Sequence, residues 1–253
     1  MLVDTHCHLD QFDDVEVVIE TASEQGVTRL VVVSEDPESM RRVLELKRQY
    51  PTHVLAGLGL HPVWIIQNRD AVQSALEQLE EILPQADELG EVGLDHKWAT
   101  DRVDQLLQEE VLTRQLDLAA RCAKPINLHA RRCLRQTMER AIAFRRDTGL
   151  NAQMHWFTQS RKLVRICNDE GVYVSVGPTV LNDVQTQRVA LEISDELLLL
   201  ETDAPVSVGG RPGHPLRVRE VAECLARLRG LEVEEIAALC AQNFARFIAP
   251  CST

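Results

Sequence analysis

The sequence is short of aromatic residues and of long apolar runs. Aromatic side chains make up only 4% of its 253 residues. No apolar run approaches the roughly 20 residues that a membrane-spanning helix needs, and the N-terminus shows neither the basic nor the apolar segment of a secretory signal peptide. These absences argue against a membrane-spanning helix, and we expect no membrane partner.

Cysteine is present, but without the spacing of a disulfide framework or a metal motif. The seven cysteines are odd in number and scattered, with no C-x-x-C pair. This usage is typical of reduced thiols in a cytosolic protein, so we expect a cytoplasmic location. Cys7 and Cys133 adjoin candidate site residues, and we interpret both as packing groups.

Positive charge is also scarce. Lysine and arginine total 27 against 39 aspartates and glutamates, which gives a net charge of −12. We do not expect such an acidic chain to bind nucleic acid through its whole surface, which argues against an architectural DNA-binding protein. A metal-dependent nuclease remains compatible with this charge, because metal ions or a small basic patch attract a polyanion locally.

The chain alternates short β-branched runs with amphipathic stretches. The expected strands are residues 2–6, 27–34, 54–60, 89–94, 125–129, 152–155, 172–176 and 197–201. The expected helices are residues 13–25, 37–50, 69–84, 101–123, 131–148, 158–171, 182–194, 215–229 and 232–248. The strands are apolar on both faces, as in a sheet that is covered on both sides.

Eight strands, each followed by a helix, predict an α/β protein with the (β/α)8 fold of a TIM barrel, as a single domain over residues 1–253. A doubly wound open sheet is the alternative. It typically has fewer strands and a glycine-rich first turn, and the sequence has no G-x-G-x-x-G motif.

Histidines gather at the carboxyl ends of the expected strands, where the active sites of such barrels are built. His6 and His8 are two residues apart, so a strand directs both imidazoles to one side. Of the eight histidines in the chain, five lie at strand ends. These five are His6, His8, His61, His129 and His155.

Six of the residues at strand ends form a candidate set of metal ligands. Four imidazoles and two carboxylates exceed the needs of one ion and suit two divalent ions, Zn²⁺, Mg²⁺ or Mn²⁺. Such a pair of ions clamps a phosphoryl or carbonyl oxygen and activates water. Glu91 comes from the fourth strand, between the two sets of ligands, and is the predicted bridge between the ions. Asp203 is the predicted general base. The set is His6, His8, Glu91, His129, His155 and Asp203.

Other residues near the strand ends are candidates for contacts with the substrate or with the ligands. Arg131 suits a phosphate because a guanidinium donates two parallel hydrogen bonds. His61 is expected to hold a substrate oxygen. Glu201 lies two residues before Asp203 and is expected to support a metal-binding histidine. A carboxylated lysine could bridge two ions only from the fourth strand itself. Lys97 falls in the loop after that strand, so we exclude it as the bridge.

Two further expectations concern arginines and tryptophans close to these positions. Arg132 and Arg135 are interpreted as a helix face that pairs with acids such as Glu139. Three tryptophans stand near strand ends, where an aromatic ring could stack on a base. Because aromatic residues are so few, we expect these rings to pack instead. They are Trp64, Trp98 and Trp156.

Six ordered segments resemble the TatD family of metal-dependent hydrolases and DNases, which belongs to the amidohydrolase superfamily of (β/α)8 barrels. They are Asp4-Thr5-His6-Cys7-His8-Leu9-Asp10, Gly59-Leu60-His61-Pro62, Gly90-Glu91-Val92-Gly93-Leu94-Asp95, Lys124-Pro125 with His129-Ala130-Arg131, His155-Trp156-Phe157 and Glu201-Thr202-Asp203-Ala204-Pro205. The resemblance extends from Leu2 to Phe247.

The resemblance implies two divalent ions, one held by His6, His8 and Asp203 and the other by His129 and His155, with Glu91 bridging them. It also implies hydrolysis of phosphodiester bonds, often from the 3′ end of DNA. We therefore expect DNA or another phosphodiester as the substrate.

The sequence departs from the family pattern around the substrate mouth. Arg132 stands where the family usually has Asp, and Thr158 and Gln159 replace a small residue and Gly. The segment 206–215 also differs from the usual Tyr-Leu and longer loop. These departures leave open hydrolysis of a carboxyl ester, lactone or amide, including removal of aminoacyl groups from tRNA. A non-enzymatic scaffold would have a damaged ligand position, and none is found.

Overall fold

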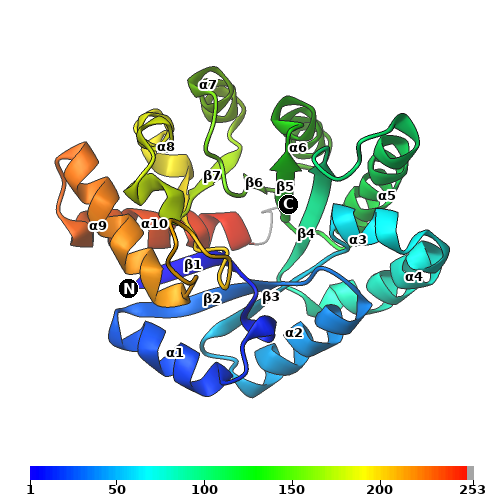
Figure 1. Cartoon of the computed structure of the whole chain (residues 1–253), viewed down its shortest axis with the longest axis horizontal. Coiled ribbons are helices and arrows are strands. Elements are labelled where there is room, and N and C mark those ends of the chain that lie inside the picture. The colour runs from blue at the N-terminus through cyan, green and yellow to red at the C-terminus, as the bar shows by residue number, and fades with distance from the viewer. Residues whose placement is uncertain (250–253) are drawn as a thin grey trace.

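The structure is a computed structural model that describes residues 1–249. Its eight strands form one parallel sheet in which β1 to β8 follow chain order (Figure 1). The sheet is nearly closed into a barrel with helices outside it, which confirms the predicted α/β barrel fold. The predicted domain of residues 1–253 ends four residues beyond the described chain. The strands are β1 Leu2–Cys7, β2 Val27–Val33, β3 Val54–Leu58, β4 Glu88–Asp95, β5 Ile126–Arg131, β6 Ala152–Met154, β7 Tyr173–Val176 and β8 Leu198–Leu200.

All nine expected helices are present, most of them shorter by one to three residues at one end or at both. The principal helices are α1 Val15–Glu24, α2 Pro37–Gln49, α4 Val72–Ile82, α5 Arg102–Arg121, α6 Leu134–Thr148, α7 Arg161–Glu170, α8 Val184–Ala190, α9 Val218–Arg229 and α10 Val233–Ile248. No helix among residues 1–249 is long and apolar enough to cross a membrane.

One short helix, α3 Pro62–Gln67, was not predicted. Its six residues are too few to show a helical periodicity. The helix forms because Pro62 fixes the backbone of the first turn, while the ring of His61 accepts a hydrogen bond from the amide of Val63. This cap holds His61 at the end of β3, beside the barrel mouth.

Strands β6 and β8 are shorter than expected because the chain turns sharply after each. Trp156 has φ 49° and Asp203 has φ 54°, both in the left-handed region that side chains other than glycine seldom adopt. His155 and Glu201 therefore lie just past the ends of their strands rather than within them.

The first and last strands close the barrel mainly through hydrogen bonds at their carboxyl ends. Seven neighbouring pairs, from β1–β2 to β7–β8, form parallel ladders, with register shifts in β1–β2 and β4–β5. Between β8 and β1, Thr5 Oγ1 donates to the carbonyl of Leu200 at 3.0 Å, and the amide of Asp203 donates to the carbonyl of His6 at 2.9 Å. This closure brings Asp203 beside the first strand.

The barrel interior changes from apolar to polar along its axis. At the amino-terminal end of the strands, residues such as Val3, Val31 and Leu199 form an apolar cluster with Phe247 of α10. Above it, polar side chains meet across the barrel: the amide of Gln153 donates to Thr5 Oγ1 at 3.1 Å. The carboxyl ends carry the titratable residues.

Candidate metal centre

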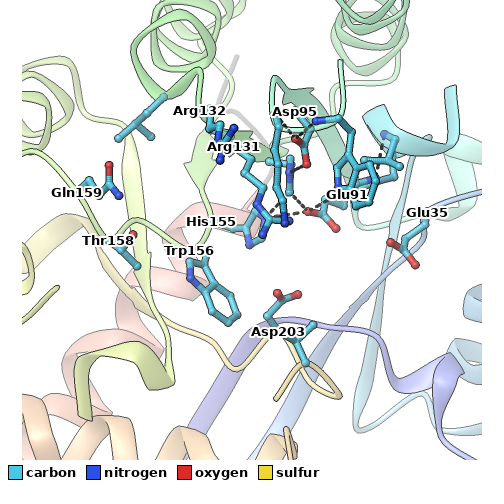
Figure 2. Close-up of a pocket in the computed structure, with 18 of the residues that line it drawn as sticks. Glu35, Glu91, Asp95, Arg131, Arg132, His155, Trp156, Thr158, Gln159 and Asp203 are labelled. Carbon is cyan, nitrogen blue, oxygen red and sulfur yellow. Dashed lines mark hydrogen bonds and ion pairs between the residues drawn. The ribbon is translucent and has the colours of Figure 1, made fainter. Parts of the chain in front are cut away.

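Glu91 of β4 lies among four histidines, and Figure 2 shows it beside one of them, His155. Its Oε1 is 2.6 Å from His129 Nδ1 and 2.8 Å from His155 Nε2. Its Oε2 is 3.5 Å from His6 Nε2 and 3.6 Å from His8 Nε2. The two oxygens of one carboxylate thus face two separate pairs of imidazoles.

Asp203 completes the set on the side of β1. Its Oδ1 lies 3.2 Å from His8 Nε2 and 3.5 Å from His6 Nε2. The ligand atoms of His6, His8 and Asp203 lie within 4.8 Å of one another. The same holds for His6, Glu91 and His155, and for His61, Glu91 and His129. All six residues of the predicted ligand set therefore converge on one place, in groups that could each hold a metal ion.

His6 and His8 converge in spite of an irregular strand. Thr5 and His6 are consecutive, and regular alternation would direct their side chains to opposite faces. Both nevertheless reach into the barrel, where Thr5 Oγ1 contacts Gln153 and His6 Nδ1 contacts Asn127. The pairing of β1 with β2 shifts between Asp4 and Cys7, which accounts for this arrangement.

Asn127 determines which nitrogen of His6 faces the carboxylates. Its side-chain amide donates to the carbonyl of Thr5 at 3.2 Å and to Glu88 Oε1 at 2.9 Å. The amide oxygen, 3.1 Å from His6 Nδ1, is therefore an acceptor, so Nδ1 of His6 donates to it. The lone pair of neutral His6 is then on Nε2, which points at Glu91 and Asp203.

Asp95 orients His129 in the same way. Asp95 Oδ2 lies 3.2 Å from His129 Nε2, while Asp95 Oδ1 accepts hydrogen bonds from the backbone amides of Lys97 and Trp98. His129 therefore donates from Nε2 and presents Nδ1 to Glu91. Asn127 had no assigned role in the sequence, although it precedes His129 by two residues on β5 and so shares its face.

Glu201 lies beside His155 but forms a hydrogen bond with the next residue, Trp156. Its Oε2 is 3.8 Å from His155 Nδ1, beyond hydrogen-bonding distance. The carboxylate instead accepts from the amide of Trp156 at 2.5 Å and from Ser175 Oγ at 2.6 Å. Burial raises its pKa to about 8. Glu201 therefore fixes the sharp turn after β6 rather than the imidazole itself.

His61 presents a donor, not a lone pair, to the centre. Its Nδ1 accepts from the amide of Val63, so in the neutral ring the proton is on Nε2, which lies 3.8 Å from Glu91 Oε1. Burial lowers the pKa of His61 to about 3, which keeps the ring neutral. Such a group suits a substrate oxygen better than a cation.

Burial lowers the pKa of His155 to about 4, whereas the three other imidazoles of the centre hold protons strongly. Burial alone would lower the pKa of His6, but the charges of Glu91 and Asp203 raise it to about 10. The pKa of His8 is raised to about 9, against the effect of burial, by its hydrogen bond to Asp203. Burial is likewise outweighed for His129, where Glu91 raises the pKa to about 9. Each of these protons occupies a position that a cation can take.

The donor set fits a metal. His6 Nε2 is buried and has no hydrogen-bond partner among residues 1–249, although two carboxylates lie 3.5 Å away. Buried polar atoms are seldom left unpaired. A cation between this nitrogen and the carboxylates of Glu91 and Asp203 would satisfy all three.

A cavity of about 890 Å³ opens above the cluster and has walls of opposite charge. Lys97, Arg131 and Arg132 line it, and Glu35 also lines it. Figure 2 shows Glu91 between the two arginines and Glu35. Arg131 thus lies where a substrate contact was expected. Arg132 was expected on an outer helix face, but its φ of 63° turns it out of β5 toward the cavity.

The remaining expectations for arginine and tryptophan are only partly met. Arg135 pairs with Glu139 at 3.6 Å, as expected, and Trp64 packs against the core. Trp98 and Trp156 instead line the cavity. Trp98 is 52% exposed, so the expectation that it packs inside is wrong.

The atypical segment 206–215 takes little part in the cavity. Val208 and Arg211 form an isolated antiparallel bridge around Gly209 and Gly210, which have φ of 62° and 75°. From this segment, Val206 alone lines the cavity within the described chain. Its departure from the family pattern therefore changes the rim more than the walls.

Known proteins match this chain along nearly its whole length. The family model described as "TatD related DNase" matches residues 3–249. The uncharacterized metal-dependent hydrolase YabD of Bacillus subtilis is 34% identical over 261 residues, covering 97% of this chain and 98% of its own. The human deoxyribonuclease TATDN3 is 29% identical over 256 residues, covering 96% of this chain and 92% of its own.

A solved structure of a TatD homologue resembles this chain in fold as well. The crystal structure of YJJV, a TatD homologue from Escherichia coli, superposes with a TM-score of 0.86 at 29% identity and covers 97% of both chains. A relative that is 34% identical to this chain is named a metal-dependent hydrolase, and the structure gathers histidine and acidic side chains that could hold metal ions. The chain therefore belongs to the TatD-related DNase family of enzymes, as its sequence motifs predicted.

Proposed function

We propose that this hydrolase uses two divalent ions to cleave phosphodiester bonds in DNA, acting as an exonuclease from the 3′ end. The observation that supports this proposal most directly is the placement of Glu91. Its Oε1 faces His129 and His155, whereas its Oε2 faces His6 and His8. A carboxylate with this arrangement suits a bridge between two ions.

In this proposal His6, His8 and Asp203 hold one ion, His129 and His155 hold the other, and Glu91 bridges them. Zn²⁺, Mg²⁺ and Mn²⁺ are the candidate ions for this mixed set of nitrogen and oxygen donors. When bound, such ions would supply Lewis-acid activation of water and would neutralise charge on the phosphoryl oxygens.

Asp203 is the proposed general base. It is 14% exposed at its side chain, so it meets both the centre and the cavity. Burial opposes ionisation, but the hydrogen bond from His8 and the charge of His6 hold the pKa of Asp203 below its ordinary value. Asp203 is thus ionised at neutral pH and can accept a proton from the attacking water.

His61 and Arg131 are the proposed contacts to the substrate phosphate. His61 donates from Nε2, and its low pKa keeps the ring neutral, so it binds an oxygen without repelling the ions. Arg131 lies on the cavity wall and adds a guanidinium, which matches two phosphate oxygens. Arg132 adds a second positive charge on the same wall, which favours phosphodiesters over uncharged esters, lactones or amides.

The test is cleavage of an oligonucleotide labelled internally and at its 3′ end, with Mg²⁺ or Mn²⁺ and measured metal content. We expect release of 3′ mononucleotides. Asp203→Asn should lower kcat by roughly 10²–10⁴-fold because the general base is lost.

A panel of carboxyl esters, lactones and aminoacylated RNA belongs in the same experiment. Metal-loaded protein that cleaves one of these but no phosphodiester would contradict the proposal. Full activity of metal-loaded Asp203→Asn would contradict the role given to Asp203.

A further inference from the structure

The loop after β4 contains a turn that is fixed directly to the metal centre. Asp95 Oδ1 accepts from the amide of Lys97 at 2.8 Å and from the amide of Trp98 at 3.2 Å. The other oxygen of the same carboxylate lies 3.2 Å from His129 Nε2. One buried side chain therefore sets the position of both Lys97 and Trp98 relative to a proposed metal ligand.

Burial in the core does not explain the position of the Trp98 side chain. It is 52% exposed and is the one aromatic ring among the large exposed apolar residues of the described chain. An indole gains considerable free energy from burial, so a tryptophan left at the wall of a cavity invites a ligand. Lys97 Nζ lies 5.5 Å from the ring centroid, which places a positive charge beside the aromatic surface.

The surrounding charges select an anionic ligand. Lys97, Arg131 and Arg132 line this part of the cavity, and none of them forms an ion pair with another residue among 1–249. By contrast, the nearby Arg135 pairs with Glu139. Glu35, which also lines the cavity, repels phosphate. In a chain of net charge −12, these three unpaired cations define a local path for a polyanion.

We propose that Lys97 and Trp98 form a nucleobase subsite beside the metal centre. Trp98 stacks on the base of a nucleotide next to the scissile phosphate, and Lys97 contacts the phosphate attached to that nucleotide. Stacking on an aromatic ring tolerates every base, because each has a π-face. This subsite rests on the proposed function, since it assumes a nucleic acid strand in the cavity.

The test is a thermodynamic cycle between Trp98 and single bases of the substrate. Oligothymidylates are compared with oligomers of equal length in which one nucleotide is abasic, so that all phosphates remain. Binding is measured by fluorescence anisotropy with Ca²⁺, and cleavage is measured separately with Mg²⁺ or Mn²⁺. The proteins are wild type, Trp98→Ala, Trp98→Phe and, as a control outside the cavity, the exposed Leu106→Ala of α5.

At one abasic position we expect wild-type affinity to fall about tenfold, in line with the energy of one stacked base. Trp98→Ala should bind the intact oligomer about tenfold more weakly and should lose nothing further at that abasic position. Trp98→Phe should restore most of the affinity, and Leu106→Ala should match wild type.

The outcomes separate this inference from the function on which it rests. If the abasic position weakens binding equally in wild type and in Trp98→Ala, the subsite is overturned, even if DNA is cleaved. Binding with the expected coupling but no cleavage of any phosphodiester by metal-loaded protein would leave the subsite standing and overturn the proposed nuclease function. Absence of oligonucleotide binding would overturn the subsite.

Discussion

Asn127 and Asp95 each decide which nitrogen of a neighbouring histidine faces Glu91. Asn127 accepts from His6 Nδ1, and Asp95 accepts from His129 Nε2. An imidazole in the other tautomer would present an N–H to the centre and would repel a cation. The geometry of the centre thus depends on hydrogen bonds between the proposed ligands and neighbouring residues that do not themselves bind a metal.

We predict that Asn127→Leu weakens metal binding by roughly 10–100-fold, the usual effect of losing such an orienting partner. The measurement is a metal titration by competition with a chelating indicator. Gln153→Leu is the matched control, because Gln153 is another buried amide of the barrel interior and contacts Thr5 and Ser175 instead. Equal weakening in both variants would indicate a general loss of stability and would contradict the prediction.

Element boundaries follow from backbone conformation that only partly shows in the sequence. The alternation of strands and helices predicts every strand to within about two residues, because hydrophobic periodicity reports burial directly. The ends of β6 and β8 were misjudged because the left-handed φ of Trp156 and Asp203 is imposed by tertiary contacts, not by residue type. The helix α3 was missed because its signal is a cap and a proline rather than a period.

The same reasoning separates the predictable and unpredictable parts of the site. His6, His8, His129 and their partners were found because strand ends converge in a barrel. The contact of Asn127 with His6 depends on the register shift in β1, and the inward turn of Arg132 depends on its positive φ. Neither feature has a local pattern in the sequence.

Gly93 permits the close approach of β4 and β5. It has φ 150°, and a Cβ atom built there would lie 2.1 Å from the carbonyl oxygen of His129. We predict that Gly93→Ala destabilises the protein by about 3 kcal/mol or more, because the clash is with backbone that cannot move aside. Urea unfolding measures this.

Gly210→Ala is the control for Gly93→Ala. Gly210 has φ 75°, but no atom lies within 4 Å of the added Cβ, so only the backbone preference is lost, at about 1 kcal/mol. Similar free energies of unfolding for the two variants would show that the β4–β5 contact is less tight than the structure indicates.

At the scale of the whole molecule, the protein combines an acidic surface with a centre that accumulates protons. The net charge of −12 counts every histidine as neutral. The pKa values of His6, His8 and His129 are nevertheless raised to about 10, 9 and 9 by the carboxylates around them. Near pH 7.5 the metal-free centre therefore carries protons that a metal must displace.

We predict that metal binding near pH 7.5 releases protons and that apparent metal affinity rises as pH increases toward 9. The sign follows because these raised pKa values favour the protonated, metal-free centre at lower pH. Calorimetric titration in buffers of different ionisation enthalpy counts the released protons. His61→Ala should leave that count unchanged, since the pKa of His61 is about 3. A titration without proton release would contradict the prediction.

The hydrogen bonds that join β8 to β1 also determine when the centre can exist. His6 and His8 are among the first residues to be synthesised, but Asp203 reaches them only after the intervening seven strands have been made and β8 has docked. Contacts so distant in sequence form late in folding. The proposed general base is therefore kept apart from the first histidines on a growing chain, and a nascent or truncated protein that lacks β8 lacks one residue of the proposed metal centre.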